Sequence, residues 1–393
     1  MKIAYVTTYN TFNSSAWTKH NIGNYSSSYY ILKTLIDQEI SIDTIGNLKK
    51  NYSWLTKGKW SFYKHCYHQD YYRWAEPKVC KNYALQINKH LSKLDVDIVL
   101  CTEGFAPIAY LKCQQPLVLW VDTVLAALIN FYPYLSNLCH ETKRNIYVIE
   151  KLALNKCNSV IFTSEWAAQK AIDIYNIDAN KVKVIPRGSN LELQPERTVE
   201  DIKYLIDKRG KDIYKLIFIG IDWQRKGGDI AIEVTKELKR RGFNVELKII
   251  GDLPTNNRDI PSFIKTIGYI NKSIFEEKQH FYNLLADSHF LILPTKADVT
   301  PNVLIEANAF GVPSITTNVG GIPSIIKDDV NGKTFPLDAN IKDYCNYIAN
   351  YLNDYQKYET LALSSFNEYV NRLNWSIGGK TAKQLFFKLI QSR

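Results

Sequence analysis

Two carboxylates near residue 300 have the side-chain type and spacing of a binding site. Asp298 and Glu306 lie eight positions apart in the segment Thr295–Pro323. Ionised carboxylates accept hydrogen bonds from hydroxyl groups but repel phosphate oxygens. We therefore expect this pair to bind neutral hydroxyl groups of a ligand. The alternative is a surface helix whose acids carry no function.

A basic turn provides a second group of candidate side chains. Arg225 and Lys226 precede the pair Gly227-Gly228, which allows a tight turn and a close approach of the backbone. Gly220 ends the apolar run before this turn. A lysine at such a turn is suited to bind a diphosphate, and a solvated basic turn is the alternative.

A third candidate lies in the first half of the chain. The apolar run Pro116–Val121 is followed directly by Asp122. A carboxylate at the carboxyl end of a buried strand is a candidate functional group. The alternative is that Asp122 only caps the next helix.

The elements around the acid pair are able to position it. Phe290–Pro294 is a short apolar run typical of a buried parallel strand. Thr300 is expected to cap the next helix, Pro301 to take its first position, and Gly311 to end it. Open α/β sheets bind ligands at the carboxyl ends of their strands, so this helix start suits a phosphate. The backbone N–H groups expected to point outward are those of Asn302, Val303 and Leu304.

The wider pattern predicts two doubly wound α/β domains. Apolar runs alternate with helical periodicity, which favours parallel sheets. The expected strands are 3–8, 41–45, 97–101, 116–121, 159–163, 214–220, 245–251, 266–270, 290–294 and 314–317. We expect a polar loop over 10–28, a helix over 29–38, an interdomain connection over 191–209 and a last helix from Arg372.

Composition restricts the class of protein. The chain has 393 residues, 22% of them charged, and a formal net charge of +10. That charge suits an anionic membrane surface or anionic substrates. No helix-turn-helix, RNA-binding or zinc-finger signature is present, so we expect no nucleic-acid partner. The seven Cys form no C-x-x-C pair, which favours a reducing compartment.

Two further segments bear on location. The first residues form an expected strand rather than a signal peptide, and Pro116–Tyr132 is too short and too interrupted for a membrane span. The segment Lys49–Tyr83 interleaves basic and aromatic residues, which suits a bilayer interface. An acceptor-facing surface or a packed helical region are the alternatives. His65, Cys66 and His68 do not have the spacing of a common metal site, so no metal is expected.

The segment containing the acid pair resembles the E-x7-E motif of retaining family 4 glycosyltransferases, which have the GT-B fold. The step Glu306-Ala307, the ending Gly311-x-Pro313 and the turn Gly320-Gly321 match that family. There the first acid contacts the donor sugar, the second holds the ribose of a nucleotide diphosphate, and the helix-start amides hold the diphosphate. The resemblance gives these roles to Asp298 and Glu306, although Asp298 is one methylene shorter than the family's Glu.

The resemblance also assigns the basic turn and the other candidates. Lys226 matches the lysine that neutralises the leaving diphosphate, whereas Ile221 stands where the family has an arginine. Arg225 and Arg187 are the candidates to replace that arginine. Asp122 falls in the acceptor site. Two residues fall where the family binds the base of the donor, Tyr269 and Ile270.

Fold and activity follow from this resemblance as expectations. The expected fold is α/β, with two facing Rossmann-like domains and an active site in the interdomain cleft. Residues 1–195 would bind the acceptor, residues 196–372 the nucleotide sugar, and residues 373–393 would return to the first domain as a helix. The expected reaction moves a sugar, with retention, from a nucleotide diphosphate donor to a hydroxyl of a glycan, lipid-linked or protein acceptor. The expected donor is UDP-linked, and no metal or other cofactor is required.

The expected location is cytoplasmic, with peripheral contact at the inner face of an anionic membrane. Two alternatives stay open. The first alternative to the transferase is a catalytically silent nucleotide-sugar-binding subunit of a transferase complex, as Ile221 and the short Asp298 suggest. The second is a nucleotide-sugar epimerase of the GT-B fold.

Overall fold

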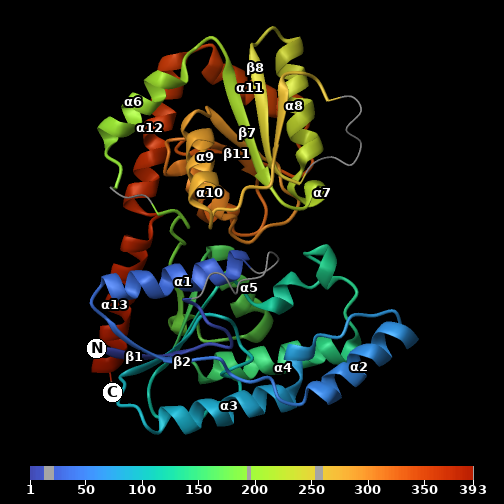
Figure 1. The fold of residues 1–393 in the computed structure, drawn as a ribbon, viewed down its shortest axis with the longest axis vertical. Helices are drawn as coiled ribbons and strands as arrows, with labels where there is room; N and C mark the ends of the chain where they lie inside the picture. Colours follow the sequence, from blue (N-terminus) through green and yellow to red (C-terminus); the bar gives the residue numbers. More distant parts are fainter. Residues whose placement is uncertain (13–21, 193–195, 253–259, 393) are drawn as a thin grey trace. The chain divides into compact units, whose positions relative to one another are not determined.

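The computed structural model describes all residues except 13–21, 193–195, 253–259 and 393, and the side chains of 22–25. The chain divides into two compact units (Figure 1). The first comprises Met1–Pro186 and Trp375–Arg393, and the second comprises Arg187–Asn374. Each unit contains a parallel sheet with six strands among its described residues. Both units are therefore Rossmann-like and have a carboxyl edge at which ligands bind.

The first sheet has the strand order β2-β1-β3-β4-β5-β6. Its strands are β1 (Lys2–Val6), β2 (Ser41–Ile45), β3 (Ile98–Cys101), β4 (Leu117–Val121), β5 (Ser159–Phe162) and β6 (Val182–Val184). Its helices are α1 (Ile22–Asp37), α2 (Ser53–Cys66), α3 (Pro77–Leu91), α4 (His140–Lys156), α5 (Glu165–Tyr175) and α13 (Trp375–Gln391). Every residue of β3, β4 and β5 is buried, which explains why these strands are continuous apolar runs.

The second sheet has the order β12-β11-β10-β7-β8-β9. Its strands are β7 (Tyr214–Gly220), β8 (Val245–Gly251), β9 (Ile264–Gly268), β10 (Phe290–Leu293), β11 (Ser314–Thr317) and β12 (Gly332–Phe335). Its helices are α6 (Val199–Arg209), α7 (Trp223–Lys226), α8 (Gly228–Arg240), α9 (Phe275–Ala286), α10 (Asn302–Asn308), α11 (Ile341–Leu352) and α12 (Tyr355–Asn371). The first strand in sequence, β7, lies between β8 and β10, so the winding direction reverses between β7 and β10.

The last helix, α13, belongs to the first unit and packs on α1. The Thr34 hydroxyl donates to the Trp375 carbonyl at 2.6 Å, and Lys383 Nζ donates to the Gln38 carbonyl at 2.7 Å. A Cβ on Gly379 would lie 2.4 Å from Thr34 Oγ1, so a glycine is needed for this close packing. The C-terminal segment thus completes the first unit after the chain has formed the second.

Two predicted loops are partly helical. The prediction of an interdomain connection over 191–209 is wrong from Val199 onward, because α6 begins there. A capping box between Thr198 and Asp201 starts this helix. Its buried Ile202 and Ile206 supply the apolar face that the many charges conceal in the sequence. The expected loop 10–28 is wrong from Ile22, where α1 begins. Ser27 and Ser28 are buried in α1, because small side chains fit against the sheet edge where Ser28 Oγ accepts from Thr102.

A buried arginine connects the ends of α6, α9 and α10 in the second unit and also contacts α12. Arg209, at the end of α6, is almost fully buried and donates to the carbonyls of Ala286, Phe310 and Gly311 at 2.6–3.0 Å. It also donates to the Tyr358 hydroxyl at 2.6 Å. The Ala286 carbonyl belongs to the last residue of α9, and the Phe310 and Gly311 carbonyls lie just after α10. The helix dipole favours a cation at both places. Arg209 therefore fixes the end of the helix that carries Glu306.

We predict that Arg209→Met lowers the free energy of unfolding of the second unit by about 3 kcal/mol, because three buried carbonyls lose a charged donor. Urea unfolding of the full chain, followed by hydrogen exchange of α6 and α10, measures this change. Arg240→Met is the matched control, since the Arg240 side chain is 72% exposed. An Arg209→Met variant as stable as this control would contradict the role given to Arg209.

Candidate active site

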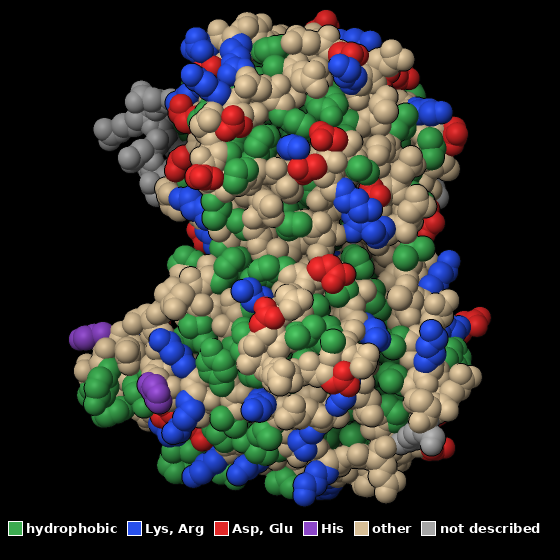
Figure 2. Space-filling view, turned by 180° about the vertical axis from the view of Figure 1, so that it is seen from behind, with side chains coloured by type: hydrophobic (Ala, Val, Ile, Leu, Met, Phe, Trp, Pro, Cys, Tyr) green, Lys and Arg blue, Asp and Glu red, His purple; other side chains and the backbone are tan. Residues whose placement is uncertain are grey.

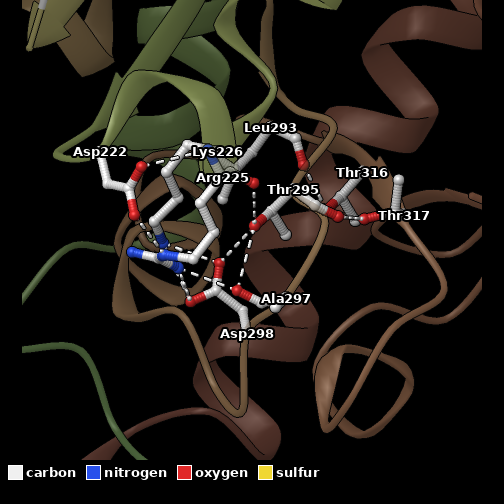
Figure 3. A network of polar contacts seen from close by, with 9 residues as sticks. All are labelled: Asp222, Arg225, Lys226, Leu293, Thr295, Ala297, Asp298, Thr316 and Thr317. Carbon is white, nitrogen blue, oxygen red and sulfur yellow. Dashed lines mark hydrogen bonds and ion pairs between the residues drawn. The ribbon is translucent and has the colours of Figure 1, made fainter. Parts of the chain in front are cut away.

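The candidate site of the second unit lies where its sheet reverses direction. Lys226 follows β7, and Asp298 lies in the loop after β10, so both are at the carboxyl edge of neighbouring strands. Lys226 Nζ donates to the two Asp298 carboxylate oxygens at 2.7 and 3.0 Å (Figure 3). Thr295 Oγ1 donates to the same carboxylate at 2.8 Å. The predicted acid and the predicted cation are thus in direct contact.

Arg225 joins the same cluster. Its Nη1 lies 2.8 Å from the Ala297 carbonyl and 3.3 Å from Asp298 Oδ1. Its Nε donates to Asp222 at 3.0 Å, and Figure 3 shows the guanidinium between the two aspartates. Asp298 therefore has two cationic partners, which makes the cluster a site where an incoming anion would compete with a carboxylate.

Two glycines give Lys226 its position. A Cβ on Gly220 would lie 2.9 Å from Lys226 Cγ, so the glycine leaves room for the lysine stem over the end of β7. Gly227 has φ +76°, and a Cβ there would lie 2.1 Å from the Pro294 carbonyl oxygen. The turn therefore packs against the end of β10, which brings Lys226 to Asp298.

The ion pair is largely withdrawn from water. The side chains of Lys226 and Asp298 are 12% and 10% exposed. Burial lowers the pKa of Lys226, while the negative charge of Asp298 opposes this shift. Charges in a site of low dielectric interact strongly with an added charge, so this pair is sensitive to an anionic ligand.

Glu306 is the second predicted acid, and it is fully buried on α10. Lys272 Nζ donates to its Oε1 at 2.6 Å. Its Oε2 has no hydrogen-bond partner among the described residues. A buried acceptor without a donor costs free energy, so Oε2 is placed to accept a hydrogen bond from a ligand hydroxyl.

Sequence reasoning missed Lys272 as the partner of Glu306. It lies in the segment between β9 and α9, and its ammonium also lies 5.0 Å from the centre of the Phe281 ring. Nothing in the local pattern connects it with an acid 34 positions later. The usable signal is its place just beyond a strand that ends at the carboxyl edge.

The start of α10 differs from the prediction. Pro301 takes the cap position and Asn302 begins the helix, so the expected cap at Thr300 is wrong by one residue. The Leu304 N–H donates to the Pro301 carbonyl at 3.2 Å. It is therefore not free for a ligand, contrary to the prediction. Pro301 has ψ 115°, an extended conformation that proline and the residue before it favour, which explains the later start.

Arg187 reaches this helix start. Its Nη1 donates to the Asn302 side-chain oxygen at 3.3 Å, and its side chain is buried. Val303 lies beside Asn302 in the first turn and is half-buried. The structure therefore places Arg187 at the start of α10. Ile221, which holds the place of the family arginine, is 42% exposed.

The two predicted base-binding residues follow β9. This strand ends at Gly268, two residues before the expected end, so Tyr269 and Ile270 lie in the loop at its carboxyl end. Tyr269 is exposed and Ile270 is buried. Asn271 N–H donates to Glu277 at 2.6 Å and holds this loop against α9.

The carboxyl edge of the first unit carries its own polar residues. Asp122 directly follows β4, and its carbonyl accepts from Thr163 Oγ1 at 3.4 Å. Sequence reasoning did not single out Glu103, which lies just after β3. This carboxylate accepts from the Thr8 N–H at 2.7 Å and from Thr8 Oγ1 at 2.6 Å, and also from the Thr7 hydroxyl. Burial raises the pKa of Glu103.

A buried glutamate supports the loop beyond Asp122. Glu150 accepts from the N–H groups of Leu125 and Ala126 at 2.5 and 3.1 Å, at the start of the 3₁₀ turn Leu125–Leu128. Tyr175 donates to it at 2.5 Å. Glu150 thus caps the turn that follows Asp122, a role that the sequence offered for Asp122. Burial raises the pKa of Glu150 to about 7.

The described residues contain neither a group of metal ligands nor a membrane-spanning helix. Outside 13–21, 193–195, 253–259 and 393, no three His, Cys, Asp or Glu side chains are grouped to hold a metal ion. Among the helices of the described chain, none is long and apolar enough to cross a membrane.

Comparison with known proteins identifies the family. Residues 214–354 match the family described as Glycosyl transferases group 1, and residues 66–193 match Glycosyltransferase Family 4. The chain belongs to the family 4 glycosyltransferases. This family has the GT-B fold, and the two Rossmann-like units agree with it. Anabaena HepE in complex with UDP has a TM-score of 0.63 at 15% identity, over 99% of this chain and 100% of HepE.

Curated glycosyltransferases are similar in sequence over part of the chain. The capsular polysaccharide biosynthesis glycosyltransferase CapM of Staphylococcus aureus is 28% identical over 59% of this chain and 62% of its own length. The UDP-Gal:alpha-D-GlcNAc-diphosphoundecaprenol alpha-1,3-galactosyltransferase of Escherichia coli is 22% identical over 55% of this chain and 57% of its own length. The chain thus spans somewhat over half the length of these two relatives.

We predict that the stability of the first unit depends on pH through Glu150. Its pKa rises from the ordinary 4.5 to about 7 on folding, so the folded state binds the proton more tightly than the unfolded state. The stabilisation is complete below pH 4.5 and is lost as the pH rises through 7. The loss is about 3 kcal/mol in total.

Glu150→Gln removes this titration. Urea unfolding at several pH values should show wild type losing stability relative to Glu150→Gln between about pH 4.5 and pH 7, and no further loss above. A constant difference between the two proteins over this range would show that Glu150 does not titrate as its burial requires.

Proposed function

We propose that this chain is a retaining glycosyltransferase that moves a sugar from a UDP-sugar to an acceptor hydroxyl in the synthesis of a cell-surface glycan. The observation that carries the proposal is Glu306, a fully buried carboxylate with Lys272 on one oxygen and no described partner on the other. Burying such a group is costly unless a ligand completes its hydrogen bonds. A ribose hydroxyl of the donor supplies that hydrogen bond.

The cationic cluster supplies the charge that the leaving group needs. As the glycosidic bond breaks, negative charge develops on the diphosphate, and Lys226 and Arg225 are held ready to stabilise it. Arg187 contributes a further positive charge at Asn302. These fixed cations perform the task that a divalent metal performs elsewhere, so we propose that transfer requires no metal or other cofactor.

The stereochemical course follows from the chemistry available. A departing phosphate oxygen is able to take the proton of the acceptor hydroxyl. The acceptor oxygen then bonds to the same face of the anomeric carbon that the diphosphate leaves, which retains the configuration. No strong protein base is then required at the reacting carbon. When the donor binds, Lys226 and Arg225 would move from Asp298 to the donor diphosphate. Asp298 would then accept hydrogen bonds from the sugar hydroxyls.

The comparisons support the substrate classes. HepE was solved with UDP, and the relative from Escherichia coli is named for a UDP-galactose donor and a diphosphoundecaprenol-linked acceptor. CapM is named for capsular polysaccharide synthesis. We therefore propose a UDP-linked donor and a glycan acceptor carried by a lipid, with Asp122 at the acceptor and transfer at the cytoplasmic face of an anionic membrane.

One observation favours a second function, a catalytically silent nucleotide-sugar-binding subunit. Asp298 is occupied by both Lys226 and Arg225, and Ile221 is exposed where an arginine would bind the donor. If Asp298 keeps its cations when the donor is bound, the nucleotide binds without transfer. Binding and turnover therefore have to be measured separately.

Calorimetric binding of UDP, GDP and ADP without metal tests the donor site. We expect selective binding of UDP, and we expect Glu306→Ala to weaken it by about tenfold or more, because a hydrogen bond to a buried carboxylate is lost. Glu233→Ala, an exposed glutamate on α8, is the matched control. Absence of nucleotide binding by the wild type would refute both candidate functions.

Turnover distinguishes the two functions. The assay measures the rate of UDP release from UDP-sugars in the presence of lipid-linked acceptors extracted from membranes. This rate should fall about a hundredfold or more in Lys226→Ala, because a cation that stabilises the leaving diphosphate is missing. Lys236→Ala, an exposed lysine on α8, should keep the wild-type rate. A wild type that binds UDP but shows no turnover would support the silent subunit, and equal rates in Lys226→Ala would exclude Lys226 from the chemistry.

A further inference from the structure

Helix α2 exposes the side chains that a helix of a soluble domain normally buries. Figure 1 shows α2 at the outer edge of the first unit, close to α4. Of its fourteen residues only Thr56 is buried. Trp54 and Phe62 are 75% and 51% exposed, and Trp60 is 44% exposed. A surface helix typically turns its apolar face to the core, so α2 has the reverse arrangement.

Polar contacts fix α2 in this orientation. Lys59 Nζ donates to Glu76 at 2.8 Å and to Glu141 at 2.6 Å. Tyr63 donates to Glu141 at 3.1 Å and stacks on Tyr71 with ring centres 5.6 Å apart. The inward face of α2 therefore carries a lysine between two glutamates, and the helix cannot rotate to bury its tryptophans without breaking these bonds.

One further contact anchors the start of the helix. Thr56 Oγ1 accepts from Arg73 Nε at 3.1 Å. Thr56, Lys59 and Tyr63 follow one another at helical spacing, so the inward face is continuous. The exposed aromatic side chains are accordingly a stable property of the fold.

The exposed face is also positively charged. Residues 49–69 contain no Asp or Glu. Lys57 and Lys64 are exposed, and the nearest recorded acid, Asp70, lies 3.8 Å from Lys64 Nζ. In Figure 2, the lower-left lobe that corresponds to α2 shows hydrophobic and Lys/Arg side chains next to histidines. Exposed aromatic and basic side chains, with Asp70 beside Lys64 at the end of the helix, form a surface that attracts an apolar, negatively charged partner.

We propose that this face of α2 is a docking surface for an anionic lipid bilayer. We call it the α2 face and define it by six residues, Trp54, Lys57, Trp60, Phe62, Lys64 and Tyr67. Tryptophan and tyrosine rings settle at the level of lipid headgroups, and lysines bind the headgroup phosphates. With fourteen residues the helix is about 21 Å long, so it lies along the surface.

Charge separates a bilayer from the competing partners. A second copy of the chain would bring the same basic face, and like charges oppose that contact. A nucleic acid would satisfy the lysines, but it offers few unstacked bases to Trp54 and Phe62 unless it is single-stranded. An anionic bilayer satisfies both the apolar and the basic side chains of the α2 face.

Only the biological role of membrane binding rests on the proposed function, in which the enzyme acts on a lipid-linked acceptor at a membrane. Binding itself is independent of donor and acceptor. Cosedimentation of the full chain with vesicles of phosphatidylcholine, with and without 30% phosphatidylglycerol (about one lipid in three), tests it without any substrate. We expect binding to the anionic vesicles that weakens as salt is added.

Paired variants test both kinds of side chain. Trp54→Ser with Phe62→Ser should reduce vesicle affinity about tenfold or more, because the apolar anchors are lost. Tyr204→Ser with Phe275→Ser is the control, since both rings are similarly exposed in the second unit. Lys57→Glu with Lys64→Glu should reduce affinity by about thirtyfold or more. Lys203→Glu with Lys342→Glu makes the same charge change elsewhere and should retain most of the binding.

Several outcomes would overturn the proposal. Wild type that ignores anionic vesicles, or α2 variants that bind like their controls, would remove the α2 face as a docking surface. Self-association or binding of single-stranded oligonucleotide that disappears in the α2 variants, without vesicle binding, would assign the face to those partners instead. Failure here is separable from failure of the proposed function, because UDP binding by calorimetry would persist in the α2 variants.

Discussion

The ion pair between Lys226 and Asp298 is the interaction on which the second unit's carboxyl edge depends. It connects the turn after β7 with the loop after β10, at the point where the sheet changes winding direction. Gly220 and Gly227 are required because a side chain at either position would push the lysine or the turn away. Arg209 supports the same edge from the far side, at the end of α10. Charge and close packing together hold this cluster of cations in place.

The two units solve the same structural problem with different chemistry. In the second, two cations surround an acid at the switch point. In the first, the equivalent reversal lies between β1 and β3, and there Glu103 binds the hydroxyls and backbone of Thr7 and Thr8. An edge rich in hydroxyl groups and carboxyl groups is suited to a sugar-like acceptor, and a cationic edge to a diphosphate. The two similar sheets therefore carry different polar side chains at their carboxyl edges.

Much of the fold is predictable from the sequence because its buried parallel strands are short apolar runs with clear ends. The stretches 214–220 and 245–251 coincide with β7 and β8. The misses have physical causes. Helix α6 hides two inward isoleucines among many charges, and α1 begins in a serine-rich stretch because tertiary packing overrides weak helix propensity. In the candidate site, local spacing reveals the acid pair and the basic turn. The contact between Lys272 and Glu306 depends on loop geometry that no local pattern encodes.

The Lys226–Asp298 pair also bears on selectivity among anions. A cell contains abundant inorganic phosphate, which an unneutralised pair of cations would bind. Here any anion has to displace a carboxylate that already satisfies Lys226 and Arg225. Free phosphate offers nothing in exchange, whereas a nucleotide sugar also brings hydroxyl groups for the buried Glu306. In the proposed donor site, the resident carboxylate would compete with incoming anions and favour ligands that bind at more than one point.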